Sequence, residues 1–199
     1  MAVRQIITIP DPKLRMSSDA VGKVDGGVRD LLDDMIETMY DAPGIGLAAV
    51  QVGVLSRAIV LDTSGKDEPP APLFIVNPEI VSAAPGRIVY EEGCLSIPDY
   101  YEEVERAESV RVRFLDRDGA ECEMEATGLL AIAIQHEIDH LNGVLFVDHI
   151  SRLKRERVLR RFSKAARRAA EEGKPFNPRE GERKPRGERK PPHPPEPLA

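Results

Sequence analysis

The feature that most constrains this chain is an H-E-x-x-H motif, which begins at His136 and ends at His140 within an apolar segment. Residues four apart lie on one face of an α-helix, about one turn from each other, so two imidazoles can point at one ion. Glu137 can then reach a water bound to that ion. The alternative is a pair of ordinary core histidines, but two histidines on one face of an apolar helix favour a metal site. We therefore predict a buried, metal-binding helix over residues 127–141, with Thr127 as its N-cap.

A third ligand is needed, because a catalytic metal site keeps three protein ligands and one open position. Metalloproteases with this motif take that ligand from a downstream Glu or His. His149 fits no such spacing after His140, and we interpret it as a loop or surface residue. Cys94 is the better candidate, since Gly93 would let backbone and ion approach closely. An inert buried thiol is the alternative for Cys94, and Cys122 is interpreted as structural.

Hydrophobic periodicity predicts an α+β fold with mainly antiparallel sheet. Besides the motif helix, apolar residues recur at helical spacing over residues 26–40 and 151–170. Strands are expected over residues 54–62, 73–82, 86–98 and 104–126, with a hairpin turn at Asp118-Gly119. The strands cluster before the motif helix instead of alternating with helices, which favours the α+β class.

Charge and composition divide the chain into a catalytic domain over residues 1–150, a basic helix over residues 151–170 and a tail over residues 171–199. The first part has 12 Lys+Arg against 27 Asp+Glu, and the second has 9 against 1. The basic helix therefore either meets an anionic partner or balances the charge of the body. Pro, Gly and charged residues dominate the tail, for which we expect disorder.

The location and assembly of the protein are constrained mainly by what the sequence lacks. No segment approaches the roughly 18 apolar residues that a membrane span needs, and the N-terminus has no apolar signal core. We expect a cytoplasmic protein without a membrane partner, and a monomer. The two cysteines, Cys94 and Cys122, are then expected to be reduced.

Three separated segments resemble the signature of the peptide deformylase family. They are GIGLAAVQ over residues 44–51, EGCLS over residues 92–96 and QHEIDH over residues 135–140. The resemblance covers residues 1–165, and the basic C-terminal helix makes the chain similar to the bacterial type of the family with a helical C-terminus. It implies antiparallel β-sheets packed around a central H-E-x-x-H helix. It also implies removal of the N-formyl group from the N-terminal formylmethionine of nascent polypeptides, with release of formate.

The resemblance also implies the ion and the residue roles. One divalent metal ion, Fe²⁺ in the family with Zn²⁺, Ni²⁺ or Co²⁺ as substitutes, is held by Cys94, His136 and His140. Glu137 is the general base, and the Gln51 side-chain amide and the Leu95 backbone N–H stabilise the developing oxyanion. The substrate-binding residues implied are Ile45, Gly46, Glu92, Gly93, Leu129, Ile132 and Ala133.

Two positions depart from relatives with this signature. Ala133 is often bulkier in relatives, which implies a roomier methionine pocket. Tyr101 stands where some relatives have an arginine near the cleft mouth, so a substrate-anchoring role is not carried over to it.

Two further hypotheses concern function. A zinc endopeptidase would share the motif but needs a downstream Glu or His ligand. The basic helix over residues 151–170 could bind ribosomal RNA through phosphate contacts, and the family resemblance implies docking on the ribosome where nascent chains emerge. Its apolar residues Leu153, Val158, Leu159 and Phe162 are expected to form one packed stripe.

Overall fold

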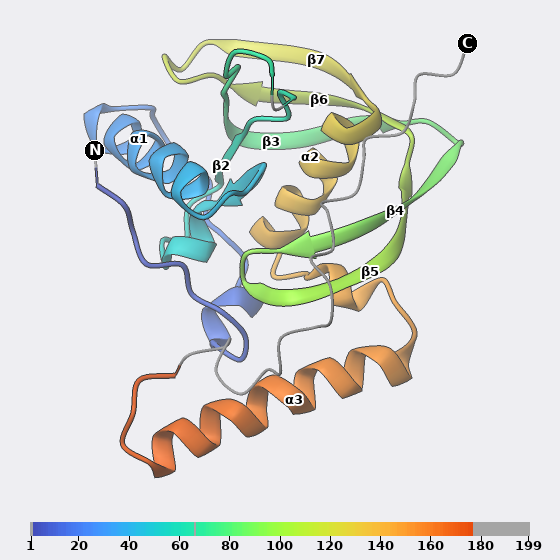
Figure 1. Ribbon diagram of the computed structural model, residues 1–199. Coiled ribbons are helices and arrows are strands. Elements are labelled where there is room, and N and C mark those ends of the chain that lie inside the picture. Colours follow the sequence, from blue (N-terminus) through green and yellow to red (C-terminus); the bar gives the residue numbers. More distant parts are fainter. Residues whose placement is uncertain (1, 66, 177–199) are drawn as a thin grey trace.

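A computed structural model describes residues 2–65 and 67–176 and contains two antiparallel sheets with a helix between them (Figure 1). The helices are α1 (Gly26–Asp41), α2 (Gly128–Leu141) and α3 (Arg152–Glu171), with short 3₁₀ turns η1 (Pro12–Arg15), η2 (Ala49–Val52) and η3 (Phe146–Asp148). The strands are β1 (Gly46–Ala48), β2 (Ala58–Leu61), β3 (Leu73–Ala83), β4 (Arg87–Cys94), β5 (Ile97–Ala107), β6 (Ser109–Leu115) and β7 (Glu121–Thr127). The predicted α+β class is confirmed.

The larger sheet has the strand order β1-β2-β3-β6-β7, and β4 and β5 form a separate hairpin. The predicted strand at residues 73–82 is present, and its pairing with β6 shifts register between Val76 and Glu79. Asn77 has a positive φ of 51° there, and Pro78 has no N–H to donate to a ladder. The predicted turn at Asp118-Gly119 is confirmed, since Gly119 has a φ of 84° between β6 and β7.

The strand predicted over residues 86–98 is present as β4 up to Cys94, but its continuation beyond Cys94 is wrong. The chain turns at Leu95 and Ser96 and returns along itself as β5. The turn was missed because Leu95 and Ser96 contain no proline or asparagine-glycine pair, and apolar residues lie on both sides of them. The reversal leaves Cys94 at the end of β4, beside the turn.

Helix α2 lies in the middle of the molecule because it is apolar on several faces. Ala131, Ile134 and Leu141 are completely buried, and they pack in one core cluster with the larger sheet. Thr127 occupies the N-cap position as predicted, but its side chain makes no capping hydrogen bond. Burial of the whole helix carries its histidines into the interior.

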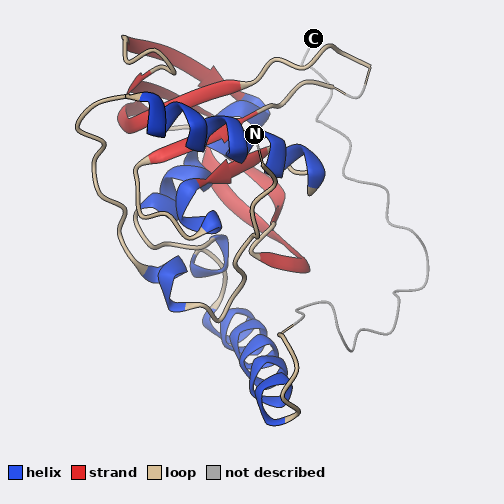
Figure 2. Ribbon diagram, turned by 90° about the vertical axis from the view of Figure 1, so that its left-hand side faces the viewer, coloured by secondary structure: helices blue, strands red, loops and turns tan. Residues whose placement is uncertain are grey.

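Helix α3 extends along one side of the molecule, beside the β4–β5 hairpin (Figures 1 and 2). Val158 and Phe162 are buried against a core cluster that includes η3, and Leu159 is partly buried. The prediction for Leu153 is wrong, because its side chain is 70% exposed. Five residues separate it from Val158, which at about 100° per residue turns it about 140° away from the buried stripe.

Helix α3 ends at Glu171, and the chain turns at Gly173 after it. Gly173 has a φ of 63° after the helix, and Phe176 packs against the core cluster that also holds Phe162. Residues 171–176 belong to the segment for which disorder was predicted, and the structure describes them as the end of α3 and the turn that follows it. Residues 177–199 lie outside the described part. No helix among the described residues is long and apolar enough to cross a membrane.

Candidate metal centre

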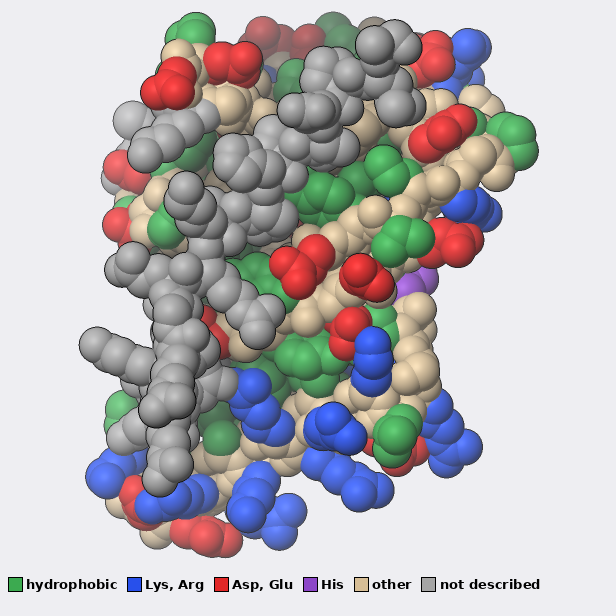
Figure 3. All heavy atoms as spheres, turned by 45° about the vertical axis from the view of Figure 1, so that its right-hand side comes forward, with side chains coloured by type: hydrophobic (Ala, Val, Ile, Leu, Met, Phe, Trp, Pro, Cys, Tyr) green, Lys and Arg blue, Asp and Glu red, His purple; other side chains and the backbone are tan. Residues whose placement is uncertain are grey.

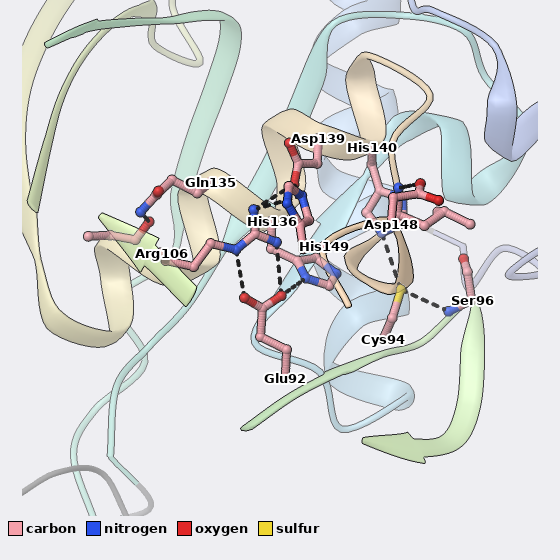
Figure 4. A network of polar contacts seen from close by, with 12 residues as sticks. Glu92, Cys94, Ser96, Arg106, Gln135, His136, Asp139, His140, Asp148 and His149 are labelled. Atoms are coloured by element: carbon pink, nitrogen blue, oxygen red, sulfur yellow. Dashed lines mark hydrogen bonds and ion pairs between the residues drawn. The ribbon is translucent and has the colours of Figure 1, made fainter. Parts of the chain in front are cut away.

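Three side chains that could bind one metal ion converge between β4 and α2. One ligand atom from each of Cys94, His136 and His140 lies within 4.8 Å of the others. The Cys94 Sγ is 3.2 Å from the His140 Nε2, and the two imidazole rings lie 5.0 Å apart, edge to face (Figure 4). Both histidines are buried. The prediction that Cys94 meets the two motif histidines is therefore supported by this geometry.

The spacing and chemistry of these three groups fit a divalent ion. Tetrahedral bonds of about 2.0–2.3 Å leave ligand atoms about 3.5 Å apart, which the observed convergence accommodates. Burial lowers the pKa of His140 well below its usual value, so its imidazole is neutral, as a ligand must be. A thiolate with two imidazoles suits several transition ions, and the donor set alone selects none of them.

The carboxylate of Glu92 orients one of these ligands. Its Oε2 is 2.7 Å from the His136 Nδ1, and Arg106 donates to both of its oxygens at 2.7 and 3.0 Å. Burial raises the pKa of Glu92, but the hydrogen bonds and charges of His136 and Arg106 outweigh it and lower the pKa. Glu92 was predicted to bind substrate, and in the structure both of its carboxylate oxygens contact His136 and Arg106.

Sequence reasoning missed Arg106, whose side chain is only 5% exposed. Its Nη1 also donates to the Asp139 Oδ2 at 2.6 Å, so one guanidinium joins β4 to α2. A signal was present: Val104 and Arg106 both face inward on β5, and an arginine in such a register needs buried anionic partners. His149, predicted as a loop or surface residue, is about one-third exposed but donates to Asp139 (Figure 4).

Glu137 follows His136 on α2 and lies within the buried group of side chains. It is buried, and its Oε2 has no hydrogen-bond partner among the described residues. Burial raises the pKa of Glu137 to about 7, although the charge of His136 opposes the rise. Gly46 on β1 makes room for the carboxylate, since a Cβ at that position would lie 2.4 Å from the Glu137 Oε1.

Gln51 has its side-chain amide fixed in one orientation. The Ala48 N–H donates to the Gln51 Oε1 at 2.8 Å, which turns the amide nitrogen toward Cys94 Sγ at 3.6 Å and Ser96 Oγ at 3.1 Å. The Ser96 N–H also donates to the Cys94 sulfur at 3.4 Å. These two contacts hold the Cys94 sulfur at the end of β4, where it faces the His140 imidazole.

A cleft of about 600 Å³ opens onto this group between β1 and β4. Twelve of the predicted site residues line it: Ile45, Gly46, Gln51, Glu92, Gly93, Cys94, Leu95, Leu129, Ile132, Ala133, His136 and Glu137. His140 is not among the lining residues. At the mouth, the exposed Tyr101 ring packs so closely on Gly93 that a Cβ there would lie 2.5 Å from it.

Comparison with known proteins yields one consistent family. The sequence profile of the polypeptide deformylase family matches residues 3–156 of this chain. A peptide deformylase of Mesorhizobium japonicum is 60% identical over 167 residues, which cover 84% of this chain and 95% of that protein.

Solved structures agree with the sequence comparison. A peptide deformylase from Ehrlichia chaffeensis, in complex with actinonin, is 42% identical with a TM-score of 0.78, covering 82% of this chain and 98% of that one. A class I type b peptide deformylase from Acinetobacter baumannii, bound to Met-Ala-Ser, is 35% identical with a TM-score of 0.72, covering 75% and 99%.

Proposed function

The chain belongs to the polypeptide deformylase family, and we propose that it is a metal-dependent hydrolase that releases formate from the N-formylmethionine of nascent polypeptides. The observation that carries the proposal is the convergence of Cys94 with the two motif histidines. A zinc endopeptidase with this motif would take its third ligand from downstream of His140. His149, the next histidine, lies against Asp139 instead.

Glu137 would act as the general base. A bound divalent ion would supply acidification of water and polarisation of the formyl carbonyl. Glu137 accepts a proton from the attacking water and delivers it to the departing amine nitrogen. Its pKa of about 7 suits both transfers near neutral pH, and its unpartnered Oε2 leaves an acceptor open.

Two donors would stabilise the negative oxygen that develops on the attacked formyl carbon. We assign this role to the side-chain amide of Gln51 and the backbone N–H of Leu95, both at the cleft. The Ala48 N–H holds the Gln51 amide in advance, so little reorganisation is needed during the reaction.

The cleft is suited to an extended peptide that starts with methionine. Strand β1 is the edge of its sheet and β4 belongs to a separate hairpin, so a substrate backbone can lie between them by strand addition. Ile45, Leu129, Ile132 and Ala133 supply apolar walls for the methionine side chain. The Met-Ala-Ser bound to the Acinetobacter relative has the sequence that deformylation of formyl-Met-Ala-Ser would leave.

The test is formate release from formyl-Met-Ala-Ser by anaerobically purified protein whose metal content is measured on the same sample. We expect equimolar formate and Met-Ala-Ser, and no cleavage of internal peptide bonds. Glu137→Gln should keep the metal and lose turnover. Metal-loaded protein that cuts internal bonds without releasing formate would identify an endopeptidase and overturn the proposal.

We propose ferrous iron as the native ion, with cytoplasmic nascent chains as substrates. The support is the family membership together with a donor set of one thiolate and two imidazoles. Iron in a near 1:1 ratio to anaerobically purified protein is the expected result. Zinc in that preparation at the same ratio would contradict the assignment.

We further propose that residues 1–150 catalyse the reaction and that α3 docks the enzyme, as a monomer, on ribosomal RNA. Lys and Arg side chains gather along α3 on the face shown in Figure 3. Arg152 and Arg160 are more than 80% exposed, although each also approaches Glu156. Phosphate contacts predict ribosome binding that weakens steeply with salt.

The test of docking is cosedimentation with ribosomes at increasing salt. A variant with Arg152 and Arg160 replaced by glutamine should bind less, yet turn over free formyl-peptides as the parent does. Equal binding by the variant and the parent at every salt concentration would refute docking through these residues.

A further inference from the structure

A continuous set of polar contacts runs from His136 to the partly exposed His149. His136 contacts Glu92, Glu92 is held by Arg106, Arg106 also donates to Asp139, and His149 lies 2.7 Å from the same Asp139 Oδ2 (Figure 4). The side-chain exposure is 9% or less from His136 to Arg106, and it rises to 21% at Asp139 and 36% at His149.

Four of these five residues form a closed ring, because His136 and Asp139 are one turn apart on α2. The backbone of the helix fixes both ends, and Arg106 and Glu92 from the β4–β5 hairpin close the ring. The orientation of the His136 imidazole therefore depends on every corner. Asp139 is the corner most exposed to water, and water competes for its carboxylate.

The direction of the His149 contact follows from the chemistry of its partner. Asp139 Oδ2 already accepts a hydrogen bond from the Arg106 Nη1 at 2.6 Å, and an ionised carboxylate has only acceptors to offer. The His149 Nε2–H therefore donates to it. The approach of Arg106 Nη1 to the same nitrogen, at 3.4 Å, is then a contact between two donors and contributes no hydrogen bond.

We propose that His149 is a positioning residue for the metal centre, which locks Asp139 and thereby the Arg106–Glu92 pair that orients His136. The inference deepens the proposed function and rests on its metal site. Without the donor at residue 149, Asp139 can rotate toward water. Arg106 then loses one of the two carboxylates that fix it, and Glu92 gains freedom beside His136. Partners of metal-bound histidines commonly affect both metal affinity and activity.

The test replaces His149 by alanine and by glutamine and follows Co²⁺ in the full-length protein. Glutamine can present an amide N–H near the position of the imidazole Nε2–H, and alanine cannot. With His149→Ala we expect Co²⁺ release to a chelator to accelerate about 10-fold, the lower end of the range for lost partners of ligand histidines. The ligand-field spectrum of bound Co²⁺ should shift, and kcat should fall more than KM rises. His149→Gln should restore the parent release rate and spectrum.

Arg117→Ala is the matched control. This variant removes the ion pair between Arg117 and Asp33, whose side chains are 39% and 25% exposed. The His149 and Asp139 side chains are similarly exposed, at 36% and 21%, but no contact in the described part of the chain joins the Arg117–Asp33 pair to the metal ligands. The variant should lower stability without changing Co²⁺ release or spectrum.

Three results would overturn the inference. The first is parent-like release and spectrum in His149→Ala, and the second is failure of His149→Gln to restore them. The third is a parent protein that binds no Co²⁺, which would also remove the metal site of the proposed function. In the first two cases formate release by the parent enzyme stands, so the two failures are distinguishable.

Discussion

Replacing Gly46 by alanine tests whether the placement of the Glu137 carboxylate controls turnover. A Cβ at this position would lie 2.4 Å from the Glu137 Oε1 and 2.9 Å from the Leu61 Cδ2. Ordinary contact begins near 3.4 Å, so the carboxylate must move by about 1 Å, and a displacement of that size can cost about 100-fold in rate. We therefore expect kcat for formyl-Met-Ala-Ser to fall about 100-fold in Gly46→Ala.

The same variant should keep its metal, because the added methyl group points at the base and at Leu61. Overpacking a buried position costs about 1–3 kcal/mol, which for a domain of this size lowers Tm by about 2–4 °C per kcal/mol. The assay is formate release over a range of substrate concentrations, with metal content and thermal unfolding measured on the same preparation. A fall in kcat at full metal occupancy separates a displaced base from a lost ion.

Two comparisons make the prediction refutable. Gly44→Ala places its Cβ 2.8 Å from the Cδ1 of Leu95, the end of a flexible side chain that can shift, so kcat should fall much less. In a Glu137→Gln background, Gly46→Ala should cost little more, since residues that act through one another are not additive. A fully metal-loaded Gly46→Ala enzyme with parental kcat would refute the reasoning.

The remaining predictions concern the oxyanion donor, the buried ion pair and the packing of α3. Gln51→Ala should lower kcat by the equivalent of about 3–4 kcal/mol with little change in KM; a change confined to KM in the formate assay would contradict its role. Arg106→Ala leaves the Glu92 carboxylate buried without its cation, so urea unfolding should show a loss of about 3–5 kcal/mol, and an unchanged midpoint would count against it. Phe162→Ala should lower the free energy of unfolding by about 3–5 kcal/mol, whereas Leu153→Ala, at an exposed position, should change it by no more than about 0.5 kcal/mol. If thermal unfolding showed the larger loss for Leu153→Ala, α3 would pack by another face.

The part of the site on α2 could be predicted from sequence because it depends on local geometry alone. His136 and His140 share a helix, and their spacing fixes their relative position wherever that helix lies. Cys94 could be nominated but not placed, since its approach to His140 depends on where β4 ends relative to α2. That relation joins residues 46 positions apart in the chain and comes from tertiary packing.

The missed features share a different physical cause. The turn at Leu95-Ser96 contains no proline, glycine or asparagine. The signal for Arg106, its alternation with Val104, has meaning only once the inward face of β5 is known. Leu153 was placed in the packed stripe of α3, although helical geometry turns it about 140° away from Val158 and its side chain is exposed. The contact of the Glu92 carboxylate with His136 joins two segments far apart in the chain, so it too depends on tertiary packing.

The charges around the centre explain why these side chains suit a divalent ion. Glu92, Glu137 and Asp139 lie in or beside the buried ring. With a Cys94 thiolate and both ligand histidines neutral, they make four negative groups against the cation of Arg106, a balance of −3 when all four are ionised. A divalent ion would reduce that balance to −1 and would favour ionised Glu137, whose pKa burial raises to about 7. Because opposite charge at the ligands favours the ionised base, ion binding and base activation are coupled. The residues that hold the ion therefore also prepare the proton acceptor beside it.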